Sequence, residues 1–421
     1  MKNFGFRKLM IFIILSATVA IAYQLPYLRY TFYDQMMAAL QLNDVQMGVL
    51  ASAVSIASTI SYPIGGFLAN KFPMRSLINL TLAAFVILTA AFAFTTNYIL
   101  LIAIHVLYGF FGIATLWSAY LVGIRGLGDE NVQSKLFGFS EATRGIIQTL
   151  IGFAFLAIMG AAATPMLGFK TMLLVGTVVT GVFLVLGFIF LPKKENTETA
   201  AAETKEKVTI GEVLKNPGVW IIILILISAY SCWSFGNGYL TTYTVRVAGL
   251  SENTASLLGM IRSYVIVFVA GFFGGWLLDR FTYKGKAFII LFGLSAVCFA
   301  LVMLSSKALA VCIFITLFVA FVANIMKSTY WSLMGQAGIP ARMTALATGV
   351  ISFIIFLPDA VLPTIIGTWL NNAEAAGNIA AGFDKIFIML ILFAVVGTIG
   401  SILLIRRTKS LPREELEEET A

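Results

Sequence analysis

Twelve long apolar runs constrain the fold of this chain more than any other feature of its sequence. A helix that spans a bilayer needs about 20 apolar residues. The runs are continuous, which favours helices over the alternating strands of roughly ten residues that build a membrane barrel. With 59% hydrophobic and 11% charged residues, the chain lacks the polar surface of a soluble protein. The runs cover residues 9–32, 45–69, 76–95, 98–124, 136–162, 169–191, 219–243, 254–278, 287–305, 308–334, 344–370 and 383–405.

Several functional classes are excluded by the residues that carry chemistry. The cysteines Cys232, Cys298 and Cys312 lie inside apolar runs and are predicted to be buried thiols, not disulfides. The single histidine, His105, is expected at the outer membrane interface, so we expect neither a metal site nor a cofactor. No catalytic triad, P-loop or dinucleotide motif stands in a polar loop. We therefore expect a protein that is not an enzyme.

The positive charges flank the apolar runs unequally on the two sides. Segments on the side of the N-terminus carry twenty Lys and Arg residues, against four on the other side. The positive-inside rule then places both termini in the cytoplasm. A net charge of +8 is thereby explained without nucleic acid. We expect a monomeric multi-pass protein of a bacterial-type plasma (inner) membrane. The alternative for the first run is a signal peptide, because Arg7 and Lys8 precede it and residues 20–22 resemble a cleavage site.

Two short motifs recur along the chain in the same order. Residues 66–72 read GFLANKF and residues 275–281 read GWLLDRF, offset by 209 residues. Residues 115–118 read TLWS and residues 329–332 read TYWS, offset by 214 residues. Two motifs that recur in the same order on either side of a polar segment indicate a duplication, as in transporters whose two halves rock about a midplane site. The predicted parts are a six-helix half at 1–191, a cytoplasmic linker at 192–217, a second six-helix half at 218–406 and an acidic tail at 407–421.

In these features the chain resembles the major facilitator superfamily over essentially its whole length. The resemblance implies an all-α membrane fold of twelve transmembrane helices in two six-helix repeats, the major facilitator fold. In that family the loop that begins with the first glycine gates the cytoplasmic side through charge contacts. Here Asn70 stands where the family has an acid, whereas the second copy keeps Asp279. The alternative is an ordinary tight turn with basic flanks. The gating residues that the resemblance implies are Gly66, Asn70, Lys71, Arg75, Gly275, Asp279 and Arg280.

Three further segments resemble the organic-anion side of the superfamily. They read YQLPYLR at 23–29, FGFSEATRG at 137–145 and IPARMTALATGVISFIIFLPD at 339–359. They are similar to the organophosphate porters and to a bacterial branch associated with sugar acids or sulfosugars. Those porters place a basic residue late in helix 1, which Arg29 matches, and a second one in helix 7. Residues 231–237 of this chain contain no cation, so the two-arginine phosphate clamp is not reproduced.

Four cations fall inside predicted helices: Arg29, Arg144, Arg262 and Lys327. A charge at membrane depth is costly and marks function by default. At about 1.5 Å per residue, Arg144 and Lys327 each lie roughly 14 Å from the cytoplasmic edge, one in each half. We predict that both bind substrate. The aromatic residues expected near these charges are Tyr23, Tyr27, Trp117, Trp233, Tyr330 and Trp331.

Two acids accompany these cations. Glu141 stands three residues before Arg144 and shares its helix face, so the two are predicted to pair, either structurally or to orient Arg144 for substrate. Asp359 and Arg262 both lie roughly 25 Å from the cytoplasmic edge, which predicts a second ion pair with a structural, gating or substrate role. Prolines near Asp359, and Pro26 before Arg29, predict helix kinks.

The four cations and two acids leave a net positive membrane interior, which an anion would neutralise. We therefore predict a secondary transporter of a small organic anion, namely a sugar acid, sulfonate, carboxylate or phosphate ester. Its substrate residues are predicted to be Arg29, Arg144, Lys327, Trp117, Trp331 and Tyr27. A proton or a sodium ion is the expected coupling ion, in symport or antiport, with Glu141 as proton carrier and Asp359 as its rival. The alternatives are proton-coupled efflux of drugs or cations and a membrane sensor or scaffold.

Overall fold

The chain is helical throughout the part that the structure describes. The structure is a computed structural model that describes residues 5–128, 133–193, 209–340 and 343–410. Within these residues, twelve helical segments are long and apolar enough to cross a membrane, which confirms the predicted number. The all-α membrane fold is thus confirmed.

Large apolar side chains cover the outer surface of the helices. Ile99, Phe272 and Leu304 are each more than 70% exposed. A soluble protein rarely leaves so much apolar surface in water. Small polar side chains, such as Ser16, Ser140 and Thr180, are instead buried between helices. The exposed apolar side chains are therefore the lipid-facing surface of a membrane protein.

The chain divides into two compact units. The first unit holds Met1–Ala202 and the short segment Leu362–Gly367, and the second holds Glu203–Val361 and Thr368–Ala421. The predicted linker at 192–217 lies largely outside the described residues, although its last part forms the short helix α9 (Ile210–Lys215). The last helix extends four residues into the predicted tail and ends at Ser410.

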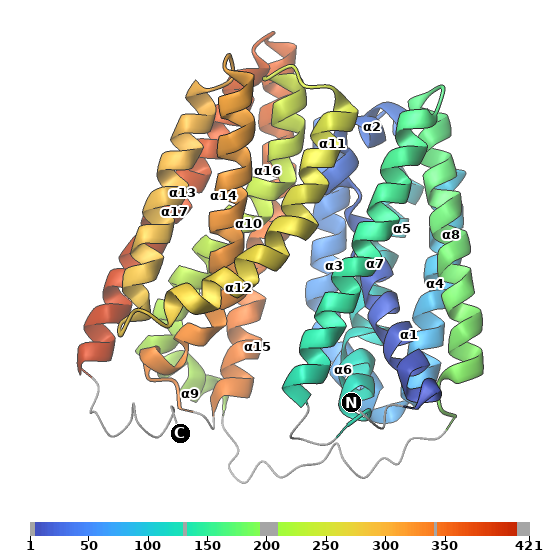
Figure 1. The fold of residues 1–421 in the computed structure, drawn as a ribbon, viewed down its shortest axis with the longest axis horizontal. Helices are drawn as coiled ribbons and strands as arrows, with labels where there is room; N and C mark the ends of the chain where they lie inside the picture. The colour runs from blue at the N-terminus through green and yellow to red at the C-terminus, as the bar shows by residue number, and fades with distance from the viewer. Residues whose placement is uncertain (1–4, 129–132, 194–208, 341–342, 411–421) are drawn as a thin grey trace. The chain divides into compact units, whose positions relative to one another are not determined.

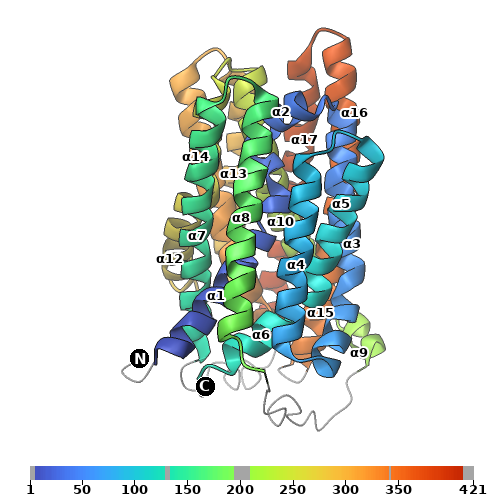
Figure 2. The ribbon, with the colours of Figure 1, turned by 90° about the vertical axis from the view of Figure 1, so that its right-hand side faces the viewer.

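In the first unit, the helices pack in pairs. Helix α1 packs on α7, α3 on α5, and α4 on α8, and Figure 2 shows α4, α5 and α8 on one side of the unit. Helix α2 lies at the end of the unit opposite the start of α1 (Figure 1). The bounds are α1 Phe6–Ala22, α2 Arg29–Leu40, α3 Asp44–Lys71, α4 Met74–Ala93, α5 Tyr98–Phe110, α6 Trp117–Arg125, α7 Gln133–Ala161 and α8 Pro165–Phe190.

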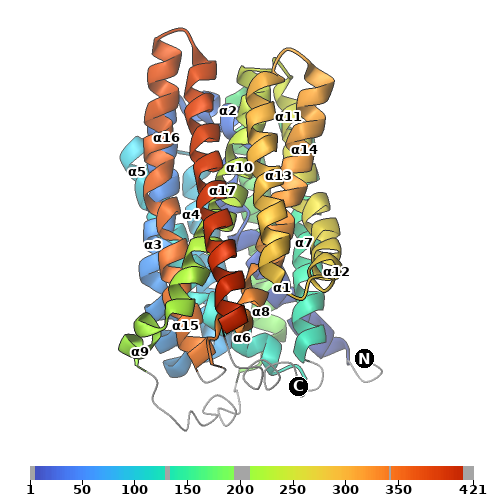
Figure 3. The same ribbon diagram turned by 90° about the vertical axis from the view of Figure 1, so that its left-hand side faces the viewer.

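In the second unit, α17 is the central packing partner. It lies against both α10 and α13, and α12 packs on α14. Figure 3 shows α17 and α13 side by side, with α15 and α16 following one another along one line. The bounds are α10 Pro217–Arg246, α11 Glu252–Met260, α12 Ile266–Leu278, α13 Lys284–Leu304, α14 Leu309–Thr329, α15 Thr344–Ile355, α16 Leu357–Ala375 and α17 Ile379–Ser410.

The predicted proline kinks are present. The first membrane helix stops at Ala22, continues as the short 3₁₀ turn η1 (Leu25–Tyr27) around Pro26, and restarts as α2. The eleventh membrane helix, formed by α15 and α16, breaks at Phe356, two residues before Pro358. Proline has no backbone N–H to donate and its ring crowds the preceding turn, so the helix ends there. These breaks place Arg29 and Asp359 next to the interruptions.

Two further interruptions have no proline. The π-helical turn η2 (Phe111–Thr115) lies between α5 and α6, and the π-helical turn η5 (Ile261–Val265) lies between α11 and α12. A π turn holds one extra residue and is frequent at functional sites. The first lies where residues 115–118 read TLWS. At the second copy of this motif, residues 329–332, α14 ends at Thr329 and passes into the 3₁₀ turn η6 (Tyr330–Leu333). Both copies of the motif therefore lie at an irregular turn of the helix.

Candidate functional site

Arg144 and Glu141 form the ion pair predicted from their spacing on α7. The side chain of Arg144 is 26% exposed and that of Glu141 is 50% exposed. Neither charge is sealed inside the first unit, so a ligand can reach both. The pair is thus a polar contact that an incoming anion can compete for.

Aromatic rings surround this ion pair. The tyrosine cluster consists of Tyr23, Tyr27, Tyr62, Trp117 and Tyr120. The hydroxyl of Tyr62 hydrogen-bonds that of Tyr23, which lies within electrostatic range of Arg144 and Glu141. The Tyr23 ring stacks on Tyr27 at 6.3 Å and meets Trp117 edge-on at 6.1 Å. The predicted aromatic residues Tyr27 and Trp117 thus belong to one group with a phenol that faces the charges.

Buried polar side chains fix α7 against its neighbours. The hydroxyl of Ser140 is bonded to Ser16 at 2.7 Å and to Tyr120 at 2.9 Å. The amide of Gln24 donates to the backbone carbonyl of Gln148, and the Gln148 amide donates to that of Ala20. In an apolar surrounding these bonds replace those that water would supply. They set the rotation of α7 and hence the direction in which Arg144 points.

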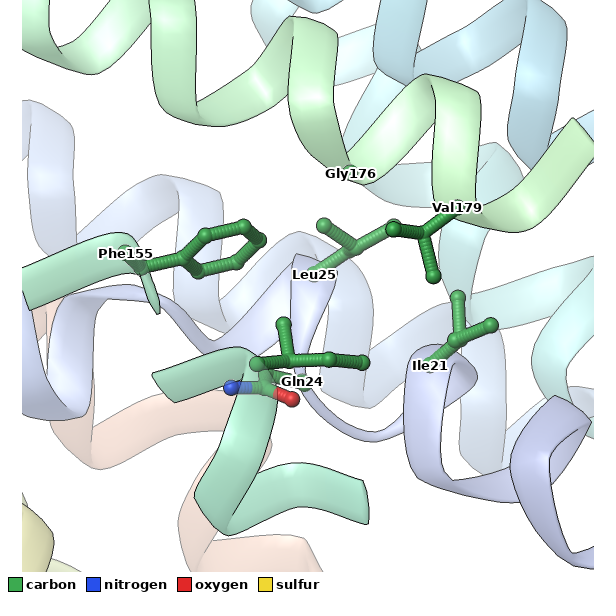
Figure 4. Close-up of a pocket in the computed structure, with 7 residues that line it drawn as sticks. Ile21, Gln24, Leu25, Phe155, Gly176 and Val179 are labelled. Atoms are coloured by element: carbon green, nitrogen blue, oxygen red, sulfur yellow. The ribbon is translucent and has the colours of Figure 1, made fainter. Parts of the chain in front are cut away.

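Two small pockets lie in the first unit. One, with about 210 Å³ of empty space, is lined by Tyr23, Pro26, Tyr27, Ser58 and Tyr108 among others, so the tyrosine cluster borders it. The other, with about 200 Å³, lies between α1, α7 and α8 (Figure 4). Its lining is apolar apart from the Gln24 amide. No charged side chain lines this second pocket, so we do not assign the anion to it.

Arg29 has its own surroundings on α2. It is buried, with its guanidinium over the rings of Tyr30 and Tyr33 at 5.8 and 5.4 Å. It also lies within electrostatic range of His105. His105 itself is buried, with its Nδ1 atom 2.7 Å from the carbonyl of Leu101. His105 is therefore packed inside the first unit, with a hydrogen bond to its own helix, and its position at the membrane interface stays a prediction.

In the second unit, Lys327 lies over an aromatic ring of a neighbouring helix. Its ammonium is 4.1 Å from the ring centroid of Trp233 on α10. The indole N–H of Trp233 donates to Asn324 Oδ1 at 2.8 Å, which fixes the ring. Trp233, one of the aromatic residues expected near the charges, is thus an aromatic neighbour of Lys327. Trp331, predicted to bind substrate, packs on Tyr330 at 5.4 Å.

Asp359 accepts hydrogen bonds from two hydroxyl groups of α10. Tyr230 donates to one carboxylate oxygen at 2.5 Å and Ser234 to the other at 3.0 Å. The Tyr230 ring also contacts Phe356, at the break between α15 and α16, and Trp233. An aromatic pair therefore connects the surroundings of Asp359 with those of Lys327.

The predicted ion pair between Arg262 and Asp359 is not formed. Arg262 lies in the π turn η5, is fully buried, and donates to Thr241 Oγ1 at 2.7 Å. The depth estimate placed both residues at one level, but it said nothing about rotation around the helix axis. A π turn contains an extra residue, which rotates the following helix by about 100°. Equal depth therefore did not bring the two side chains together.

The two glycine-led motifs lie at helix ends. In the first, Lys71 lies near the rings of Phe67 and Phe72, and Arg75 donates to the carbonyl of Phe188. The side chain of Asn70 lies outside what the structure describes. Gly66 has open space beside its Cα atom.

The second motif is arranged differently. Arg280 stacks on Trp276, with 3.9 Å from the guanidinium carbon to the ring centroid. Asp279 ends α12 and is exposed. Gly275 also has open space beside it. The second motif thus keeps an exposed acid for a partner to contact.

Sequence reasoning missed the neutral partners of the charged groups. Tyr62, Tyr230, Ser234 and Asn324 each bind a residue that had been singled out, or its neighbour. All four lie on helices distant in sequence from the group they contact. The only available signal was polarity within an apolar run, which Tyr230 and Ser234 share with many residues that play no such part.

Comparison with known proteins agrees with this arrangement. The sequence profile described as Major Facilitator Superfamily matches residues 3–363. The chain is 25% identical over 385 residues to the inner membrane protein YqcE of Escherichia coli (strain K12), covering 89% of this chain and 90% of that protein. It is 24% identical over 424 residues to the inner membrane protein YihN of the same organism, covering 98% and 99%.

Solved structures share the fold. A bacterial homologue of the human lysosomal transporter Spinster superposes with a TM-score of 0.72 at 14% identity, covering 95% of this chain and 96% of that one. A D-xylose-proton symporter superposes with a TM-score of 0.69 at 16% identity, covering 94% of this chain and 95% of that one. These neighbours are transporters, and this chain is not an enzyme. The profile match over most of the chain, together with the shared fold, shows that the chain belongs to the Major Facilitator Superfamily.

Proposed function

We propose that the protein is a secondary active transporter of a small organic anion, working by alternating access. The observation that carries the proposal is the reachable Arg144 beside the tyrosine cluster in the first unit. A guanidinium binds carboxylate, sulfonate or phosphate through two parallel hydrogen bonds. The phenol and indole faces beside it suit the apolar face of a sugar or other ring. The candidate substrates are therefore sugar acids, sulfonates, carboxylates and phosphate esters.

We infer that Lys327 is the anion-binding cation of the second unit. Its ammonium lies over the ring of Trp233 and lacks the rigid, planar donor geometry of a guanidinium. It therefore acts as a point charge that tolerates different anion shapes. Arg29, buried among tyrosines on α2, supplies further positive potential in the first unit. Because a net positive site in a membrane is costly, the bound state is favoured by an anion that shares the charge.

We propose that a proton is the coupling ion and that Glu141 carries it. Glu141 pairs with Arg144, the cation that we propose binds the anion. An anion that binds Arg144 competes with this carboxylate, so substrate binding and the state of Glu141 are linked. Two relatives are named inner membrane proteins, and we place this protein in a bacterial inner membrane with both termini in the cytoplasm.

A thermal-stability screen tests the substrate class. The purified protein is heated with gluconate, glucuronate, a sugar sulfonate, lactate or glycerol phosphate. Glucose, as the neutral match of gluconate, and a quaternary ammonium drug are the controls. We expect at least one anion, and neither control, to raise the Tm, with about 2.7 kcal/mol of stabilisation at one hundred times its Kd. Stabilisation by the ammonium drug and by none of the anions would instead indicate efflux of cations.

The exposed acid of the second gating motif gives a separate prediction. Asp279→Asn is expected to slow transport turnover while leaving the affinity for the anion unchanged, because Asp279 lies at the end of α12 and away from Arg144 and Lys327 in sequence. The measurement compares binding affinity with the maximal uptake rate. Asp384→Asn, a change of an acid outside either motif, is the matched control. Equal losses of affinity and turnover in Asp279→Asn would contradict a gating role.

A further inference from the structure

Arg262 is a deeply buried charge of the second unit. It is fully buried and is the largest side chain among those with essentially no exposed surface. Its single hydrogen bond goes from Nη2 to Thr241 Oγ1 at 2.7 Å. The Nε and Nη1 atoms are buried without a hydrogen-bond partner. Within the described residues, Arg262 takes part in no ion pair. An arginine always carries its charge, so a buried positive group here lacks its counter-charge.

Small polar groups lie near this guanidinium. The thiol of Cys312, on α14, lies within electrostatic range of it and hydrogen-bonds Ser305. Gly259 lies one turn before Arg262, and a Cβ atom there would come within 2.8 Å of Thr241 Oγ1. The glycine thus leaves the space in which Arg262 and Thr241 meet. Guanidinium, hydroxyl and thiol groups all donate hydrogen bonds to an anion.

The local backbone also points to a site and not to ordinary packing. Arg262 belongs to the π turn η5, an irregularity that is rare in helices and frequent at functional sites. An unpaired buried charge is expensive, whereas the same charge with a bound counter-ion is tolerated. Buried N–H groups without partners commonly mark an ion or water position.

We propose that Arg262, with Thr241, forms a buried binding site for a small inorganic anion such as chloride. The site is distinct from Arg144 and Lys327, and it stands whether or not the transported substrate is an organic anion. The bound ion supplies the missing counter-charge and accepts hydrogen bonds from Nε and Nη1. It thereby stabilises the contact between α10 and the π turn.

Chloride itself is the probe that tests this site. The purified wild-type protein is unfolded thermally without any organic anion, as chloride replaces sulfate at constant ionic strength. We expect a saturable effect, with the Tm rising by about 2 °C for each tenfold increase in chloride above half-saturation. Bromide is expected to substitute for chloride. Equal Tm values at all chloride concentrations would overturn the proposal, and this result needs no variant.

Substitutions assign the effect to Arg262. Arg262→Met removes an unpaired buried charge at similar volume, a change that proteins often tolerate, and is expected to abolish the chloride response. Thr241→Val is expected to shift half-saturation to higher chloride. Lys327→Met, the matched removal of another membrane cation, is expected to keep the full response. A chloride response that persists in Arg262→Met would overturn the proposal. The proposal would also be overturned if an organic anion, but not chloride, stabilised the wild-type protein and Arg262→Met abolished that stabilisation. Arg262 would then belong to the substrate site.

Discussion

In proteoliposomes, Arg144→Met is expected to abolish uptake of the anion while the protein still inserts and folds. Removing one partner of a desolvated charge pair costs about 2–5 kcal/mol, which is roughly a thirtyfold or greater loss of affinity. The change also leaves the Glu141 carboxylate facing the anion, which adds repulsion. Lys327→Met is expected to abolish uptake in the same way. Binding is measured by thermal stabilisation and transport by uptake of the labelled anion.

Three further variants separate a binding role from a folding role. The double variant Glu141→Gln with Arg144→Met carries neither charge and is expected to stay inactive, so repulsion alone is not the cause. Arg144→Lys keeps the charge without the planar fork, and partial uptake is expected. Lys307→Met removes an exposed cation between α13 and α14 and is expected to transport normally. Normal uptake by Arg144→Met or by Lys327→Met would show that the site is elsewhere.

The second large effect concerns coupling. Glu141→Gln fixes this side chain in a neutral form, so uptake driven by a pH gradient is expected to be lost. Exchange of internal for external anion does not require net proton movement and is expected to continue. The two assays are run on the same proteoliposomes, with and without the gradient, so that one preparation reports both.

Asp359→Asn is the competing variant for the same measurement. The sequence predicted an ion pair of Asp359 with Arg262, but in the structure Tyr230 and Ser234 donate hydrogen bonds to Asp359. We expect Asp359→Asn to retain accumulation driven by the pH gradient. If it loses accumulation and Glu141→Gln retains it, Asp359 is the proton carrier. If both variants accumulate the anion normally, neither carboxylate carries the coupling ion.

The fold was largely predictable because it follows from hydropathy and chain length. Twelve apolar runs became twelve spanning helices, and prolines such as Pro26 and Pro358 marked two of their breaks. The π turns η2 and η5 were not predictable, since each depends on one extra residue whose cost is met by packing and leaves no proline in the sequence. The same limit explains why the rotation of Arg262 was missed.

The candidate site was predictable only where its contacts are local. The pair of Glu141 and Arg144 follows from a spacing of three residues on one helix. The partners of Lys327 and Asp359 lie on α10, about a hundred residues away, and depend on how two helices rotate against each other. The depth of a residue along a helix can be counted in residues, but the direction in which its side chain points around the helix axis is set by packing.

Counterflow in proteoliposomes tests the central claim most directly. Vesicles are loaded with a high concentration of one compound, and a trace of the same labelled compound is added outside, without any ion gradient. The panel holds gluconate, glucuronate, a sugar sulfonate, lactate and glycerol phosphate, with glucose and a quaternary ammonium drug as comparisons. The account predicts transient accumulation of at least one labelled anion, and none of glucose or of the drug. Accumulation of the cationic drug with no anion accumulated would contradict it.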